Sequence, residues 1–122
     1  MLIKNETKNT VLADKAVIAN TLLKRMKGLL GEKELARGKA LVLEPCNAIH
    51  CFFMRFTIDV LFLGKDNRVV KALPEIKPFQ FSKIYWGAVK VIELPANTIK
   101  STQTSDGDII TFVNVQSGST PF

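Results

Sequence analysis

One stretch of the sequence, residues 45 to 63, concentrates the side chains that are capable of chemistry. It contains the only histidine, His50, both cysteines, Cys46 and Cys51, and the carboxylate Asp59, among mostly apolar neighbours. A buried carboxylate needs hydrogen bonds or a cation nearby, because its charge is costly to remove from water. The stretch is therefore the best candidate site, although it does not define a reaction.

The histidine and the cysteines could suggest metal or thiol chemistry. On a regular strand, however, His50 and Cys51 point to opposite faces, so they cannot share one tetrahedral metal ion without a bulge. A Cys–His nucleophile would also need a third group that orients the base, and the sequence shows none. We therefore predict no catalytic residue, no metal ligand and no cofactor, and we expect Cys46 and Cys51 to be reduced thiols.

A second segment, residues 77 to 86, interleaves aromatic and basic side chains. Rings beside cations could stack on a sugar or on single-stranded nucleic acid. The alternative, which we favour, is that Phe79, Phe81 and Trp86 fold back to cover an open end of the sheet. The exposure of these rings distinguishes the two interpretations.

The elements that must position these residues are mostly strands. Short apolar runs bounded by turn residues predict strands at 1–4, 10–12, 16–19, 40–43, 58–63, 68–73, 88–94 and 109–113. The first three are expected to form a meander. Pro74 and Pro78 are expected to make the segment after residue 73 irregular. Within residues 58 to 63, alternation places Asp59 on the face opposite Val60.

The clearest helix is predicted at residues 21 to 30, where apolar residues recur at i, i+1, i+4, i+7 and i+8. At 100° per residue, Arg25 lies at the edge of this apolar stripe and can reach inward. We expect Arg25, Asp59 and Glu93 to form one structural charged cluster that holds the helix against the sheet.

The pattern as a whole predicts one mainly β domain (α+β by content) over residues 1–122. Its expected architecture is a β-sandwich or barrel-like sheet with the helix at 21–30 and one or two short helical turns, one of them after Pro95. Residues 116–122 are expected to be a frayed tail.

Composition restricts the class of protein further. The chain has 122 residues, 47% hydrophobic and 23% charged, which is typical of one ordinary soluble domain. No apolar run approaches the roughly 20 residues of a membrane span, and no signal peptide is recognisable, so we expect a cytoplasmic protein without a membrane partner. The net charge of +6 is spread along the chain, so it identifies no partner, and nucleic acid is disfavoured. The oligomeric state does not follow from the sequence.

Several short motifs occur in an order that resembles one protein family. They are Arg25-x-x-Gly28-Leu29-Leu30, Ile49-His50-Cys51-x-x-Met54, Ile58-Asp59-Val60-x-Phe62-Leu63, Val91-Ile92-Glu93-Leu94-Pro95-Ala96 and Gly107-Asp108. Over about residues 10 to 113, this order resembles the DUF192 family, also called UPF0127. The resemblance implies a β-rich sandwich or barrel with short helices, and no known function. The family's usual Trp-Met-Lys-Asn-Thr motif is replaced here by residues 50 to 54, which lack its polar side chains.

These observations lead to one functional hypothesis and two alternatives. We expect a non-enzymatic module that binds an unknown small ligand or protein at a pocket near His50, Met54, Phe79 and Trp86. One alternative is an enzyme that uses Cys51 and His50. The other is an adaptor that binds nucleic acid or protein through its basic surface.

Overall fold

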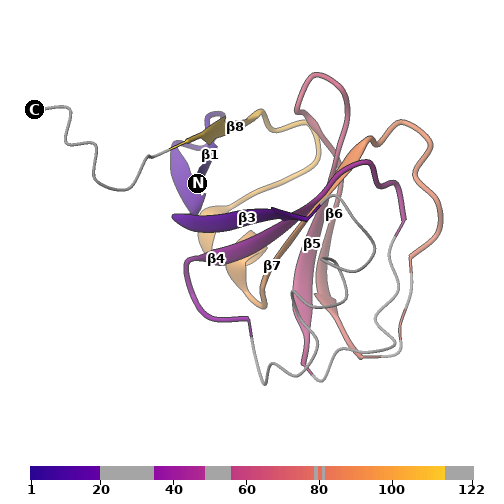
Figure 1. Ribbon diagram of the computed structural model, residues 1–122, viewed down its shortest axis with the longest axis horizontal. Helices are drawn as coiled ribbons and strands as arrows, with labels where there is room; N and C mark the ends of the chain where they lie inside the picture. Colours follow the sequence, from indigo (N-terminus) through magenta and orange to yellow (C-terminus); the bar gives the residue numbers. More distant parts are fainter. Residues whose placement is uncertain (20–34, 49–55, 79, 81, 115–122) are drawn as a thin grey trace, which may run out of the picture.

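The computed structural model describes residues 1–19, 35–48, 56–78, 80 and 82–114, which form two β-sheets and one short helix (Figure 1). The strands are β1 (Leu2–Asn5), β2 (Thr10–Ala13), β3 (Lys15–Ala19), β4 (Lys39–Leu43), β5 (Ile58–Leu63), β6 (Val69–Ile76), β7 (Lys90–Pro95) and β8 (Ile110–Val113). The helix, α2 (Thr98–Thr102), follows β7.

The larger sheet has five strands in the order β3-β4-β7-β5-β6. β3 and β4 are parallel, and the other three pairs are antiparallel. β5 lies inside this sheet and is buried at all six positions, which explains why it is apolar on both faces apart from Asp59.

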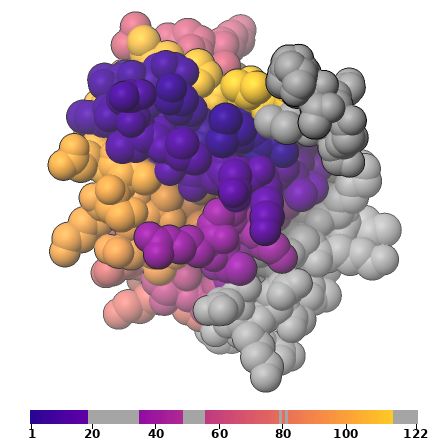
Figure 2. Space-filling view, turned by 90° about the vertical axis from the view of Figure 1, so that its left-hand side faces the viewer, coloured from indigo at the N-terminus to yellow at the C-terminus, as the bar shows by residue number. Residues whose placement is uncertain are grey.

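The smaller sheet brings the two ends of the described chain together. Its order is β2-β1-β8, and both pairs are antiparallel, with Leu2 opposite Val113. In Figure 2 the N-terminal strands occupy the centre of the visible face, and the orange segment that holds α2 lies beside them.

Two apolar clusters cover the two faces of the larger sheet. The first lies between the sheets, because it combines Ile3, Leu12 and Ile110 of the smaller sheet with Leu61 and Leu94 of the larger one. The second cluster covers the opposite face of the larger sheet. It consists of Leu41, Leu43, Ile58, Val60, Phe62, Ile76, Ala88 and Val91, with Tyr85 among the partly buried residues packed against it. This arrangement is a sandwich of two sheets with an additional covered face.

The edge strand β6 departs from regular pairing at two places. Between Ile58 and Val60 of β5, the paired residues on β6 are Ile76 and Leu73, so β6 has one extra residue near Pro74. Glu75 at this point has a φ of +56°. A second irregularity lies beside Val70, where β5 advances by one residue and β6 by two. Such bulges re-aim side chains and interrupt an edge against further pairing.

The structure confirms a mainly β, single small domain with two sheets and no closed barrel among its described residues. Two expectations are wrong. The meander stops after β2, because β3 joins the other sheet in parallel with β4. The irregular segment does not begin directly after residue 73, since β6 continues through Pro74 to Ile76, which an edge strand tolerates at a bulge; the described residues 77, 78, 80 and 82–84 belong to no strand or helix. The expected helix at 21–30 and tail at 116–122 lie outside the described residues. Within the described residues, no helix is long and apolar enough to cross a membrane.

Candidate functional site

Two predicted site residues, Phe79 and Trp86, belong to the segment 77–86, and the structure describes only Trp86. It lies at the tip of a tight turn. The Ala88 amide donates a hydrogen bond to the Tyr85 carbonyl oxygen at 2.9 Å, which closes a four-residue turn with Trp86 and Gly87 at its centre. The Trp86 side chain is 83% exposed. Trp86 therefore does not fold back over the sheet, contrary to the interpretation that we favoured; Phe79 and Phe81 lie outside the described residues.

The turn is fixed to the sheet on both sides of Trp86. Before it, the Tyr85 ring packs against the buried Phe62 ring with centroids 4.5 Å apart, and the Tyr85 amide donates to the Asn47 carbonyl at 2.9 Å. After it, Ala88 is buried, and the Val89 amide donates to the Leu63 carbonyl at 2.8 Å. Because its neighbours are held, the exposed indole is presented from a defined position.

Two apolar side chains and one cation accompany Trp86. Ile84 is 47% exposed, and Val70, at the β6 bulge, is also exposed. A Cβ atom added to Gly64 would lie 3.4 Å from the Gly87 carbonyl oxygen and 3.6 Å from a Val70 methyl, so the β5–β6 turn touches the Trp86 turn. The Lys83 Nζ lies 5.3 Å from the centre of the Tyr85 ring, within cation–π distance.

Asp59 is completely buried and accepts hydrogen bonds from two backbone amides. Its Oδ1 accepts from the Glu75 amide at 3.0 Å, and its Oδ2 accepts from the Ile99 amide at 2.8 Å. The first amide belongs to the β6 bulge. The second belongs to the first turn of α2, whose N-cap residue, Asn97, makes no side-chain capping bond. Asp59 thus does for α2 what an N-cap side chain normally does, and it also satisfies the bulge.

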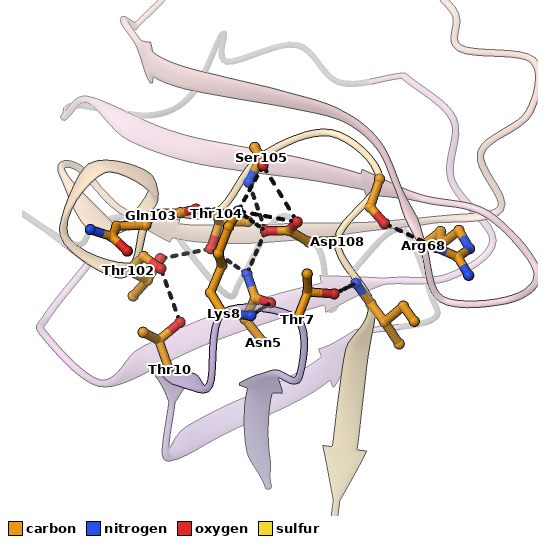
Figure 3. A network of polar contacts seen from close by, with 12 residues as sticks. Asn5, Thr7, Lys8, Thr10, Arg68, Thr102, Gln103, Thr104, Ser105 and Asp108 are labelled. Atoms are coloured by element: carbon orange, nitrogen blue, oxygen red, sulfur yellow. Dashed lines mark hydrogen bonds and ion pairs between the residues drawn. The ribbon is translucent and has the colours of Figure 1, made fainter.

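A second buried polar network joins the β1–β2 turn to the segment after α2 (Figure 3). The fully buried Asn5 donates from Nδ2 to Thr104 Oγ1 at 3.0 Å and to Asp108 Oδ2 at 2.9 Å, and its Oδ1 accepts from the Lys8 amide. Thr10 donates from its hydroxyl to the Thr102 carbonyl at 3.0 Å. We call this set the latch: Asn5, Lys8, Thr10, Thr102, Gln103, Thr104, Ser105 and Asp108.

Lys8 and Asp108 form the charged centre of the latch. The Lys8 ammonium donates to Asp108, to the Gln103 carbonyl and to the Ser105 hydroxyl, with a shortest distance of 2.9 Å to Asp108 Oδ2. Burial by itself would raise the pKa of Asp108. Hydrogen bonds from Asn5, the Ser105 amide and Lys8, together with the positive charge of Lys8, outweigh burial and lower this pKa below its ordinary value.

The same segment also protects the edge of β6. Asp106 Oδ1 accepts from the Ala72 amide at 2.8 Å, and the Asp108 carbonyl accepts from the Val69 amide at 2.9 Å. In return, the Gly107 amide donates to the Val69 carbonyl at 2.8 Å. Edge amides that would otherwise be open to another strand are therefore occupied.

Comparison with known proteins assigns this architecture to a family. The DUF192 family model, described as "Uncharacterized ACR, COG1430", matches residues 3–112. The chain belongs to the DUF192 family. A UPF0127 protein of Thermococcus kodakarensis is 34% identical to it over 118 residues, which cover 91% of this chain and 73% of the relative. A UPF0127 protein of Pyrococcus horikoshii is 37% identical over 112 residues, which cover 89% and 96% of the two chains.

A solved structure shows the same fold at low sequence identity. A protein of unknown function from Novosphingobium aromaticivorans superimposes with a TM-score of 0.76 and 16% identity, covering 91% of this chain and 82% of that protein. At this identity the likeness concerns the DUF192 fold and carries no functional residue with it.

The structure separates the two acids of the predicted charged cluster. In the β5–β7 pairing, Asp59 is opposite Leu94 and Glu93 is opposite Val60, so their side chains lie on opposite faces of the larger sheet. Asp59 faces the cluster between the sheets, whereas Glu93, also buried, faces the other one. Arg25 lies outside the described residues. Asp59 is inward-facing as expected and accepts two backbone amides, and its predicted contact with Arg25 stays a prediction.

The expectations about thiol and metal chemistry at His50 and Cys51 stay predictions. His50, Cys51 and Met54 lie outside the described residues. The Cys46 Sγ lies 3.0 Å from the Ala48 carbonyl oxygen, to which the thiol donates. In the part of the chain that the structure describes, no group of three His, Cys, Asp or Glu side chains could hold a metal ion.

The latch residues were not predicted as a site, and their chemistry is structural. Lys8 Nζ lies within hydrogen-bond distance of the Ser105 hydroxyl, but it also forms an ion pair with Asp108, so its contacts join the β1–β2 turn to the segment after α2. Gly107-Asp108, one of the DUF192 motifs, was the only signal in the sequence. Asn5 and Lys8 lie about a hundred positions away and carried none.

Proposed function

We propose that this DUF192 domain is a non-enzymatic binding module whose contact surface includes Trp86. The observation that carries the proposal is an indole that is 83% exposed although both of its flanks are anchored. Tryptophan is one of the residues that are enriched at the energetic centres of binding surfaces. The apolar residues Ile84 and Val70 extend this surface.

The proposal extends to the predicted pocket residues His50, Met54 and Phe79. In it, His50 supplies a titratable hydrogen bond, and Met54 and Phe79 supply apolar wall beside Trp86. Residues 45 to 48, which lead into the stretch of His50 and Met54, are joined to the Trp86 segment: Asn47 accepts from the Tyr85 amide, and the Cys46 amide donates to the Val89 carbonyl. This connection supports a shared site.

A thermal-shift screen of a small-metabolite library, with variants, tests the proposal. Because Trp86 is the only tryptophan, its fluorescence reports directly on the surface. A ligand at 100 times its Kd should stabilise the protein by about 2.7 kcal/mol. Trp86→Ala and His50→Ala should remove that shift for the ligands found.

Val113→Ala is the matched control, because Val113 is also an exposed apolar residue but lies on β8 in the other sheet. Trp86→Ala itself should change the free energy of unfolding by less than about 0.5 kcal/mol, as expected for an exposed side chain. If every ligand found stabilises Trp86→Ala and His50→Ala as much as the unaltered protein, the site is wrongly assigned.

A further inference from the structure

The Trp86 turn combines apolar exposure with local positive charge. Segment 77–90 carries Lys77, Lys83 and Lys90 and no acidic residue. Lys83 and Lys65, the latter in the adjoining β5–β6 turn, are both exposed. The acid beside Lys65 is Asp66, which is paired with Arg68 at 3.5 Å and accepts the Arg68 amide. Among the described residues, no acid forms an ion pair with Lys65 or Lys83, although the Asp66 carboxylate also lies at this turn, since a Cβ atom added to Gly64 would be 3.1 Å from its Oδ1.

The size and shape of this surface restrict the class of partner. Of the described residues, Trp86, Ile84 and Val70 expose an apolar patch on the order of a few hundred Å², whereas each partner of a stable protein interface contributes roughly 800 Å². Among the described residues of this surface, Trp86 is accompanied by Ile84 and Val70, which do not stack on bases as a nucleic acid would require. A projecting indole with aliphatic neighbours and flanking lysines matches what interfacial membrane contacts require.

We infer that the Trp86 turn docks on an anionic lipid surface, with the indole and Ile84 entering the interface and Lys65 and Lys83 meeting lipid headgroups. The inference rests on the proposed function, since it names the partner of the same turn. It requires neither a membrane span nor a signal peptide, and the expectation of no membrane partner was based on these two features. Lysines near an anionic leaflet add to binding, and the tryptophan ring favours the headgroup level.

Vesicle binding by the whole chain tests the inference. The two probes are vesicles of phosphatidylcholine alone and of phosphatidylcholine mixed equally with phosphatidylglycerol. The anionic vesicles should sediment the protein and shift the Trp86 emission to shorter wavelength, because the indole leaves water. The neutral vesicles should do so at least about tenfold less.

Matched variants distinguish binding through the Trp86 turn from a general attraction due to the net charge of +6. Lys65→Glu with Lys83→Glu should lower partitioning to the anionic vesicles at least about tenfold. Lys15→Glu with Lys39→Glu changes the net charge equally at exposed positions on β3 and β4, and should lower it much less. Trp86→Ala should also cost about tenfold, whereas Val113→Ala should not.

Several results would overturn the inference. They are the absence of binding to anionic vesicles, equal losses in the two lysine pairs, or quenching of Trp86 by oligothymidylate at concentrations where vesicles have no effect; the last would favour nucleic acid. If the metabolite screen succeeds through Trp86 while vesicles fail, only the lipid inference falls. If vesicles bind through Trp86 and His50→Ala changes nothing, the predicted pocket falls and the lipid contact stands.

Discussion

Asp59→Asn should destabilise the protein strongly, although it replaces only one carboxylate oxygen by an NH₂ group. The carboxylate accepts the Glu75 and Ile99 amides on separate oxygens in a site with no solvent exposure. Asparagine offers one oxygen, so one amide loses its acceptor and faces an NH₂ group. Both of these donors, the amide and the NH₂ group, are then buried without an acceptor, and each costs about 1–3 kcal/mol. Removing the buried charge recovers part of this free energy. The expected net loss is about 2–4 kcal/mol.

Urea unfolding followed by far-UV circular dichroism is the suitable assay, because Trp86 is already exposed and its fluorescence reports poorly on unfolding. The expected loss corresponds to a decrease in Tm of roughly 8–16 °C for a chain of this length. Asp66→Asn is the matched control. Asp66 also accepts a backbone amide, from Arg68 at 3.2 Å, but its side chain is 66% exposed, so water can replace it at a cost below about 1 kcal/mol.

Equal losses in Asp59→Asn and Asp66→Asn, within about 0.5 kcal/mol, would refute the assignment of two essential buried amide contacts. A double-mutant cycle with Arg25→Met tests the other reading of Asp59. Because both carboxylate oxygens are occupied by amides, we expect the two substitutions to be additive within about 0.5 kcal/mol. A larger coupling energy would show that the Arg25 guanidinium contacts the carboxylate after all.

The remaining predictions concern the latch and the Phe62–Tyr85 ring pair that holds the Trp86 turn. The lowered pKa of Asp108 stabilises the fold above the pKa that this carboxyl has when unfolded, about 4, and this stability is lost as the pH falls through the folded pKa. Asp108→Asn should therefore lower stability at pH 7 and flatten the acid side of the stability–pH curve; an unchanged acid limb would contradict this. Phe62→Ala should cost about 3–5 kcal/mol, because Phe62 is fully buried, and should release Tyr85. A cost below about 1 kcal/mol in urea unfolding would show that the ring pair does not hold the turn.

Strand positions were largely predictable because they depend on local signals. The apolar run of β5 and its turn residues fixed its place at Ile58–Leu63, as observed. Strand partners were not predictable in the same way. β3 follows β2 after one residue, so a meander was the local expectation, but pairing with β4 buries Ala16 and extends the larger sheet. That gain depends on residues more than twenty positions away.

The polar sites show the same division between local and distant information. A buried acid at position 59 was predictable from its apolar neighbours. Its partners were not, because one is the Glu75 amide at the β6 bulge and the other is an amide of a short helix forty positions away. Asn5 and Lys8 resemble ordinary turn residues, and only their contacts with Asp108 reveal that they belong to one polar network. Side chains whose partner is distant backbone leave no pattern in the sequence.

The position of β1 between β2 and β8 constrains how this domain can form during synthesis. β1 is synthesised more than a hundred residues before its partner strand β8, in which Val113 lies opposite Leu2. At cellular rates of translation, β1 waits on the order of ten seconds for that partner to be synthesised. Until β8 is made, the inner side chains of the first hairpin, Ile3 and Leu12, lack the cover that Ile110 of β8 gives them in the folded domain.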